Sequence, residues 1–376
     1  MATEHHKLYK IDSKGKLRVW FINSTDTTYQ VVSGIHDGKL VESTPKIIKG
    51  KNIGKVNETT PSEQVLKEVA ALYEKQEKTE GYYPNIEDAG KGKSYFSPML
   101  AEKFSEKDCP DYVFQSPKFD GFRCVIYNDR IHSREGEPFL SVPHIQEAMK
   151  PLIEKYPSIV FDGELYNHKY KDEFEKIQSI LTKRVNISDE DLELSKNTIQ
   201  YFIYGIYDRD NPNMTMTERV SWMDEHLSQL PSCIQKVRQL YIPKEKIMEY
   251  YWEELNSGFE GQMLVDPDSV YEVDKRSKAL RKHKPVFDTE CIIVSVTEGV
   301  GNWQGAVKSI QVKDIETGNI SEAGVDGKRE FNQYLWSIRD ELIGTMVTIE
   351  HRGVTKHNKF RFPVCKKFWL DTTRKY

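Results

Sequence analysis

The sequence predicts an α+β protein in three parts: a small β-rich domain, a mixed central domain and a C-terminal β-barrel. Short strand-like runs separated by turns fill residues 7–57. From about residue 95 to 284, β-rich runs alternate with helical stretches, and beyond residue 285 strands return with one helix-like segment. The 376 residues can form more than one core. We place the domains at residues 1–83, 84–285 and 286–376.

The N-terminal domain is predicted from two hairpins and a capped helix. "LYKID" and "LRVWFIN" flank the turn "SKG", and "YQVVSG" and "KLVES" flank "IHDG". Thr60 suits the helix cap, Pro61 the first helical position, and Glu63 completes a capping box. Val65, Val69 and Leu72 form an apolar stripe that ends before Gly81, and the polar stretch 82–94 reads as a linker.

The central and C-terminal parts differ in their patterns. "RCVIY", "SIVFDGELY" and "IQYFIYGIYD" predict strands, whereas "DEFEKIQSILTKRV" and "TERVSWMDEHLSQL" predict helices. After "RKHKP", three strand-like runs surround the single helical segment "REFNQYLWSIRDELIG". Strands with one helix over such a length are typical of a small Greek-key barrel such as an OB-fold.

Bulk composition excludes several classes of protein. With 38% hydrophobic and 30% charged residues, the chain is that of a folded, water-soluble protein, and no apolar run approaches the length of a membrane span. Five scattered cysteines without a CxxC pair indicate reduced thiols inside a cell and argue against a zinc site. The net charge of −4 does not itself indicate nucleic acid, so a phosphate-binding surface requires local clustering.

"PKFDGFRC" combines Lys118, Asp120 and Arg123 in a run suited to a buried strand. Alone, this pattern fits a salt-bridged edge strand as well as a reactive lysine. Further along, "FDGEL" places Asp162 and Glu164 two residues apart, which on a strand puts both on one face.

Two later segments carry further charge. "GFEGQMLV" sets Glu260 before an apolar strand, and "KRSKALRKHKP" alternates Lys282 and Lys284. Each segment could be a charged surface strand. Together, the order of lysine, carboxylate, aromatic strand, carboxylate and paired lysines favours a catalytic site over a set of charged surface strands.

In these segments the chain resembles the covalent nucleotidyltransferases, and among them the ATP-dependent DNA ligases. The resemblance covers about residues 95–370 and rests on "SPML", "PKFDGFR", "SREGEPF", "FDGEL", "YGIYD", "FEGQMLV" and "YEVDKRSKALRKHKP". It implies an adenylation domain of antiparallel sheets with flanking helices, followed by an OB-fold. It also implies that ATP forms a lysyl-AMP intermediate, that AMP passes to a 5′-phosphate, and that a 3′-hydroxyl then seals the nick.

The resemblance assigns roles residue by residue. Lys118 is the expected nucleophile, with Glu164 and Glu260 binding ribose or Mg²⁺, and Tyr207 stacking on adenine. Asp120 is expected to be structural. The remaining expected nucleotide contacts are Ser116, Pro117, Arg123, Arg134, Arg276, Lys282 and Lys284. Because a free lysine has a pKa near 10.4, we expect the cations around Lys118, and a bound metal, to favour its neutral amine.

Two regions depart from the family pattern or fall outside it. "RFPVCKKFWLD" is similar to the family's last motif, but Trp369 stands where an arginine is expected, which leaves Lys366, Lys367 and the weaker Arg361 as candidates to orient pyrophosphate. Residues 7–80 look like a small WGR-like domain. Its clustered lysines predict non-specific phosphate contacts, against the alternative of a solvated loop: Lys46, Lys49, Lys51 and Lys55.

The sequence-based hypothesis is therefore a monomeric, intracellular ATP-dependent DNA ligase acting on nicked duplex DNA with Mg²⁺, in DNA repair, replication or recombination. It is expected in the cytoplasm of a bacterium or phage-infected cell, or in the nucleus of a eukaryote. The alternatives are an RNA ligase or an mRNA guanylyltransferase, which share the lysine chemistry, and an inert DNA clamp. An NAD⁺-dependent ligase is disfavoured, since its nicotinamide-binding domain and zinc module are not seen.

Overall fold

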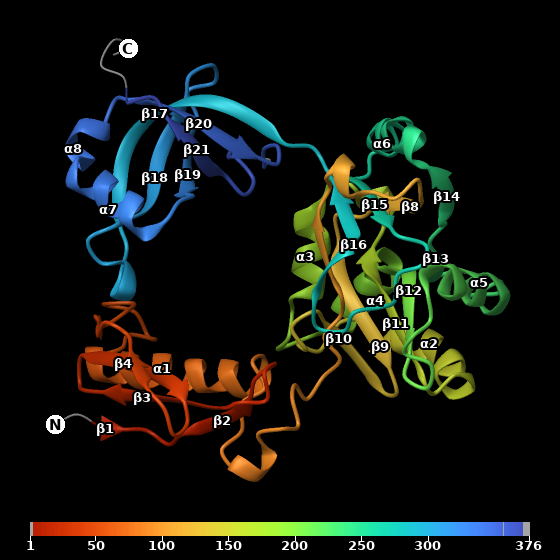
Figure 1. Ribbon diagram of the computed structural model, residues 1–376, viewed down its shortest axis with the longest axis horizontal. Coiled ribbons are helices and arrows are strands. Elements are labelled where there is room, and N and C mark those ends of the chain that lie inside the picture. The colour runs from red at the N-terminus through yellow and green to blue at the C-terminus, as the bar shows by residue number, and fades with distance from the viewer. Residues whose placement is uncertain (1–2, 356, 371–376) are drawn as a thin grey trace. The chain divides into compact units, whose positions relative to one another are not determined.

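The computed structural model describes residues 3–355 and 357–370 (Figure 1). The chain divides into two compact units: residues 93–284 form one, and the segments before and after them form the other. Asp371 and the five residues after it, the end of the predicted C-terminal domain, lie outside the described residues.

The N-terminal segment forms an antiparallel sheet with one long helix against it. Strand β3 pairs with β1, β2 and β4, and β4 also pairs with β5 and β6. The elements are β1 (Thr3–Glu4), β2 (Leu8–Ile11), β3 (Leu17–Ser24), β4 (Thr28–Ile35), β5 (Leu40–Glu42), β6 (Lys46–Ile47), α1 (Pro61–Lys78) and the 3₁₀ turn η1 (Ile86–Asp88). Both predicted hairpins are confirmed, as β2–β3 and β4–β5.

Helix α1 begins as its sequence predicts. The Thr60 hydroxyl accepts from the Glu63 backbone N–H, and the Glu63 carboxylate accepts from the Thr60 N–H, so the capping box is complete. Val65, Val69 and Tyr73 are buried against Leu8 and Trp20 of the sheet. The helix ends at Lys78, ahead of Gly81.

The unit of residues 93–284 consists of two five-stranded sheets with helices around them. Their strand orders are β10-β9-β11-β12-β13 and β14-β8-β15-β16-β7. The strands are β7 (Leu100–Lys103), β8 (Tyr112–Lys118), β9 (Phe122–Tyr127), β10 (Arg130–Ser133), β11 (Ile159–Tyr166), β12 (Gln200–Asp208), β13 (Ile234–Lys236), β14 (Leu240–Pro243), β15 (Gly261–Val265) and β16 (Arg276–His283). The helices are α2 (Pro143–Lys155), α3 (Phe174–Leu181), α4 (Asp189–Thr198), α5 (Met216–His226) and α6 (Ile247–Asn256), with 3₁₀ turns η2 (Glu106–Asp108), η3 (His168–Tyr170) and η4 (Lys244–Lys246).

Most strand pairs in these sheets are antiparallel, as predicted, but two edge pairs are parallel. Strand β13 runs parallel to β12, and β7 runs parallel to β16. Helix α5 lies between β12 and β13 in the chain, and such a crossover is what a parallel pair needs. The main core packs the first sheet against the helices, with Phe161, Leu165 and Tyr201 fully buried.

The C-terminal segment is a closed five-stranded barrel in the order β17-β18-β19-β21-β20, which fits the predicted OB-fold. Its elements are β17 (Phe287–Glu298), β18 (Val307–Asp314), β19 (Ile320–Val325), β20 (Met346–His351), β21 (Val364–Phe368), α7 (Arg329–Ser337), α8 (Arg339–Leu342) and the 3₁₀ turn η5 (Gly301–Trp303). The predicted single helix is instead two, because Ile338 leaves helical backbone angles between α7 and α8.

Candidate active site

A cavity of about 250 Å³ is lined by residues from both sheets of the 93–284 unit. This volume lies just below the range of about 300–1,000 Å³ that is usual for small-molecule sites. Most of the residues singled out from the sequence line it: Ser116, Pro117, Lys118, Arg123, Arg134, Glu164, Arg276 and Lys282. The cavity therefore brings together segments that are far apart in the chain.

Lys118 is the last residue of β8 and pairs with Gly261 at the start of β15. The Glu260 N–H donates to the Lys118 carbonyl over 2.9 Å, which fixes the two residues beside each other. The Lys118 ammonium forms an ion pair with Glu260 Oε2, while Lys284 Nζ lies 2.5 Å from Glu260 Oε1. Glu260 thus bridges the predicted nucleophile and one of the two paired lysines.

The charge of Lys118 differs from the sequence-based expectation. Burial lowers its pKa, but the carboxylates of Glu260 and Glu164 outweigh burial and raise the pKa above its ordinary value. The expectation that cations hold this amine neutral is wrong for the nucleotide-free protein, because Lys284 is neutralised by the same glutamate that holds Lys118. The expected lowering of a lysine pKa by nearby cations occurs instead at Lys282, where burial is the largest cause and Arg276 and Lys284 add to it.

Close packing explains why residue 121 of the "KFDGFR" segment is glycine. A side chain there would place Cβ 2.6 Å from the Leu165 carbonyl oxygen and 2.9 Å from Glu164 Cγ. The loop after Lys118 therefore packs against β11 at the level of Glu164, which keeps the lysine and the second carboxylate near each other.

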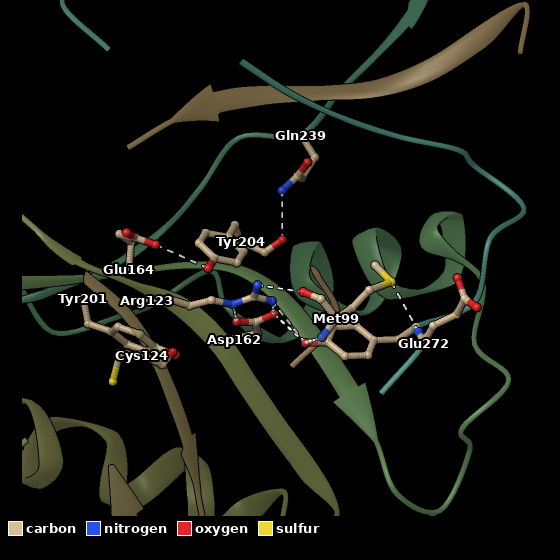
Figure 2. A network of polar contacts seen from close by, with 10 residues as sticks. Met99, Arg123, Cys124, Asp162, Glu164, Tyr201, Tyr204, Gln239 and Glu272 are labelled. Atoms are coloured by element: carbon tan, nitrogen blue, oxygen red, sulfur yellow. Dashed lines mark hydrogen bonds and ion pairs between the residues drawn. The ribbon is translucent and has the colours of Figure 1, made fainter. Parts of the chain in front are cut away.

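Glu164, the second carboxylate of the cavity, has a pKa well above its ordinary value. Burial raises its pKa to about 7, although Lys118 and Arg123 lower it. The Tyr204 hydroxyl donates to Glu164 Oε2 over 3.4 Å (Figure 2). Near neutral pH this carboxyl group can therefore hold or release a proton.

Arg123 is held by a buried network of polar contacts (Figure 2). Its Nε and Nη2 donate to the two oxygens of Asp162 over 2.9 and 2.6 Å, and Nη1 donates to the Met99 carbonyl over 2.7 Å. The Tyr271 hydroxyl also donates to Asp162, over 2.6 Å. Since the hydrogen bonds to Asp162 and Met99 together use three of the five guanidinium N–H donors, Arg123 chiefly shapes the wall of the cavity.

The tyrosine of β12 that lines the cavity is Tyr204 rather than the predicted Tyr207; Phe119 and Tyr271 are the other aromatic lining residues. A β-bulge at Tyr204 interrupts the pairing of β12 with β11, so the two tyrosines do not follow simple alternation along the strand, and only Tyr204 lines the cavity. Tyr207 packs against Phe96 and Tyr271, with ring centroids 5.2 and 5.6 Å apart. It supports the wall from behind.

The other basic residues line the cavity with little internal pairing. Arg276 begins β16 and donates to the Ala101 carbonyl over 2.5 Å. Arg134 follows β10 and forms an ion pair with its neighbour Glu135, with about half of its side chain exposed. Such loosely held cations are available to an anionic ligand.

The candidate residues of the C-terminal motif lie in the barrel. Lys366 pairs with Asp326 over 2.6 Å, and Lys367 Nζ lies 3.4 Å from the centre of the Trp369 ring. The Trp369 indole donates to Thr348 over 3.1 Å. Trp369 therefore anchors its strand and holds Lys367 by a cation–π contact.

The carboxylates fit a Mg²⁺ ion that is bound mainly through phosphate oxygens. Within the described residues, no group of three or more His, Cys, Asp or Glu side chains could hold a metal alone. Glu164 and Glu260 supply two carboxylates, and Mg²⁺ commonly takes one or two together with phosphates and waters.

Several cavity residues were not predicted from the sequence. Asp162 was noticed only as a strand carboxylate, and Tyr271, Arg219 and Gln239 were not singled out. Gln239 donates to the Tyr204 carbonyl over 3.0 Å, and the Arg219 guanidinium lies over the Tyr271 ring at 5.4 Å. Asp162, Tyr204 and Tyr271 stand in the segments "FDGEL", "YGIYD" and "YEVDKRSKALRKHKP" that carry the family resemblance, whereas Arg219 and Gln239 lie outside those segments.

Comparisons with known proteins agree on one family. The sequence profile described as "ATP dependent DNA ligase domain" matches residues 98–284. The chain is 23% identical over 275 residues to a DNA ligase of Haemophilus influenzae, covering 73% of this chain and 91% of that one. It is 24% identical over 270 residues to a DNA ligase of Methanococcus aeolicus, covering 67% of this chain but only 47% of that longer protein.

Solved structures share the fold. A structure designated "Pmar-Lig_PreS3" superposes with a TM-score of 0.61 at 22% identity, covering 82% of this chain and 72% of that chain. A Lig E DNA ligase, described as binding DNA with a minimal scaffold, superposes with a TM-score of 0.60 at 20% identity, covering 72% and 98%. The matching domain and the relatives together show that the chain is an enzyme of the ATP-dependent DNA ligase family.

Proposed function

We propose that this ligase seals nicks between a 5′-phosphate and a 3′-hydroxyl in duplex DNA through a lysyl-AMP intermediate on Lys118. The observation that carries the proposal is the placement of Lys118 in the cavity, bridged to Lys284 by Glu260 and close enough to Glu164 for mutual pKa effects. Two carboxylates and two further lysines around one amine suit attack on a phosphoryl group.

The first step forms a bond between Lys118 Nζ and the α-phosphorus of ATP and breaks the bond to pyrophosphate. The nitrogen must lose a proton, which the raised pKa of Lys118 opposes while Glu260 is its partner. Entry of the triphosphate offers Lys282 and Lys284 a stronger anionic partner. We infer that this exchange loosens the grip of Glu260 and that Glu260 or Glu164 accepts the proton.

The remaining residues bind and orient the nucleotide. Tyr204 stacks on the adenine, Ser116 and Pro117 line the base pocket beside it, and Arg134 and Arg276 contact ribose or phosphate. Glu164 and Glu260 would hold Mg²⁺, which supplies positive charge to the phosphoryl oxygens when bound. Asp120 and Arg123 act by positioning.

The rest of the chain fits this role. The C-terminal barrel contributes Lys366 or Lys367 toward the leaving pyrophosphate, and the N-terminal domain, WGR-like in our sequence-based hypothesis, contacts DNA. We further propose a monomer that works inside the cell. Among the described residues, no helix is both long enough and apolar enough to cross a membrane.

Covalent labelling tests the nucleophile. Lys118→Ala is expected to abolish the enzyme–AMP adduct and all sealing that starts from ATP, whereas Lys107→Ala, an exposed lysine of the same unit, keeps both. The readout is retention of radiolabel from α-labelled ATP on denatured protein. A stable adduct on the Lys118→Ala protein would show that another residue is the nucleophile.

The same assay separates the alternatives. A guanylyltransferase labels from GTP in preference to ATP, and an inert clamp labels from neither. Chasing the adduct onto nicked DNA and nicked RNA duplexes separates a DNA ligase from an RNA ligase. We expect labelling from ATP and transfer to nicked DNA.

A further inference from the structure

The N-terminal segment carries a loop with an apolar tip, residues 49–58 ("KGKNIGKVNE"), between β6 and α1. Val56 and Ile53 are the two most exposed large hydrophobic side chains in the described part of the chain, with Val56 fully exposed and Ile53 81% exposed. Neither packs on the core, so their apolar character has no role in the stability of the domain.

The apolar-tipped loop is nevertheless held in a defined shape. The Thr59 N–H donates to the Lys51 carbonyl over 2.9 Å, and the Lys51 N–H donates to the Thr59 hydroxyl over 3.1 Å. Within the loop, the Gly54 N–H donates to the Glu58 carboxylate over 2.7 Å. A side chain at Gly50 would place Cβ 2.3 Å from the Thr59 carbonyl, so the two ends close only with glycine there.

Lysines surround the exposed tip. Lys46 and Lys51 are tied to Glu68 on α1, at 2.8 and 3.1 Å. Lys49 and Lys55 are exposed and form no ion pair with any described residue. The loop therefore offers two cations without an ion-pair partner among the described residues, one before Ile53 and one between Ile53 and Val56 in the sequence.

We propose that the apolar-tipped loop docks in the minor groove of duplex DNA. Lys49 and Lys55 contact phosphates, while Ile53 and Val56 press against the base edges or part a base step. Apolar side chains flanked by cations are how many minor-groove proteins grip and bend DNA without reading sequence. The inference rests on the proposed function, because it takes nicked duplex as the ligand.

An anionic membrane could also attract a loop of lysines and apolar residues. DNA is favoured because the same chain carries a DNA ligase domain, to which a second contact adds affinity. Because the tip is already ordered by backbone hydrogen bonds, little conformational entropy is lost when it binds.

Two double variants separate the phosphate and groove contacts. Ile53→Ser with Val56→Ser removes the apolar tip and keeps the charges, whereas Lys49→Gln with Lys55→Gln removes the charges and keeps the tip. Leu66→Ser is the matched control, since Leu66 is 59% exposed on α1 of the same domain. All substituted side chains are exposed, so the fold should survive each change.

The measurements are the Kd for nicked duplex at several salt concentrations and the fluorescence of 2-aminopurine placed at successive steps around the nick. The serine pair should weaken binding roughly tenfold with an unchanged salt slope, and should abolish the fluorescence rise that reports unstacking. The glutamine pair should reduce the slope of log K against log salt by about 0.9 for each lysine. The Leu66→Ser protein should match the wild type.

Each contrary result has a defined meaning. If both double variants bind DNA like the wild type, the loop does not contact DNA. If they lose binding to anionic phosphatidylserine vesicles instead, the partner is a membrane. Adduct formation from ATP without DNA should be unchanged in every variant. A wild-type protein that forms no adduct would contradict the proposed function itself, whatever the loop binds.

Discussion

Two glutamates of this protein each hold two lysines, and only one of the two clusters is a candidate active site. Glu68 in the N-terminal segment pairs with Lys46 and Lys51, and Glu260 pairs with Lys118 and Lys284. The glutamate side chains are 18% and 19% exposed, so burial does not separate them.

The pKa of the lysine does not separate them either. Burial lowers the pKa of Lys46 and of Lys118, but Glu68 with Tyr29 at Lys46, and Glu260 with Glu164 at Lys118, outweigh burial and raise it. The difference lies in the surroundings. Lys118 has a cavity beside it and a second carboxylate, Glu164, whose pKa is raised to about 7. A reactive lysine is recognised here by its neighbours rather than by its own charge.

Removing each glutamate charge tests this difference, and we expect the largest effect here. Glu260→Gln should slow adduct formation from ATP at least about 100-fold, because the amide no longer holds Lys118 and Lys284 together or accepts a proton. Glu68→Gln should leave the adduct rate within about twofold of the wild type. Single-turnover labelling measures both rates. Equal loss in the two variants would mean that the Glu260 cluster has no special role.

The cavity is the second feature of the Glu260 cluster, and two tyrosines of β12 test its role. Tyr204→Ala should raise the KM for ATP in adduct formation roughly tenfold, since stacking on a base contributes about 1–3 kcal/mol. Tyr207→Ala removes a ring that packs against Phe96 and Tyr271 outside the cavity lining, so it should keep KM within about twofold and lower the Tm instead. If the two effects are exchanged, the sequence-based choice of Tyr207 was right.

The sequence predicts those elements of the fold that depend on short-range patterns. The hairpins follow from turn residues between alternating strands, and α1 follows from a capping box that spans four residues. The parallel edges β12–β13 and β7–β16 were not predicted, because pairing between distant segments leaves no local pattern. The break at Ile338 was likewise hidden within a continuous helical pattern.

The site residues also divide into those that local motifs predict and those that depend on tertiary folding. Motif order identified Lys118, Glu164, Glu260 and the basic residues, which the structure gathers around one cavity and its Glu260 bridge. Motif order indicates Tyr207 rather than Tyr204, because the β-bulge at Tyr204, which decides which tyrosine lines the cavity, leaves no local pattern in the sequence. Nor could it give the charge of Lys118, which depends on a glutamate that only tertiary folding places beside it.

The smallest expected effect is a difference in how the stability contributions of Glu164 and Glu68 depend on pH. The Glu164 pKa rises from 4.5 to about 7 on folding, mainly through burial. Between these values the folded protein binds more protons than the unfolded chain, so its stability falls as pH rises through this window. The Glu68 pKa is lowered to about 2: burial raises it, but hydrogen bonds from Lys46, Gln64 and Lys51 outweigh burial. Its contribution is therefore present above pH 4.5 and is lost as pH falls toward 2.

Replacing each glutamate by glutamine should reveal these opposite pH dependences of stability, measured without ATP or metal. Glu164→Gln should gain about 2–4 °C in Tm relative to the wild type between pH 5 and pH 8, which corresponds to about 1 kcal/mol. Glu68→Gln should be less stable than the wild type at pH 7 by at most about 1 kcal/mol, because the pair is partly solvated, and the gap should close as the pH falls below 4. Melting curves at these pH values measure both. Parallel Tm profiles for Glu164→Gln and the wild type would mean that Glu164 is already ionised at pH 5, and the contrast between the two glutamates would then rest on the cavity alone.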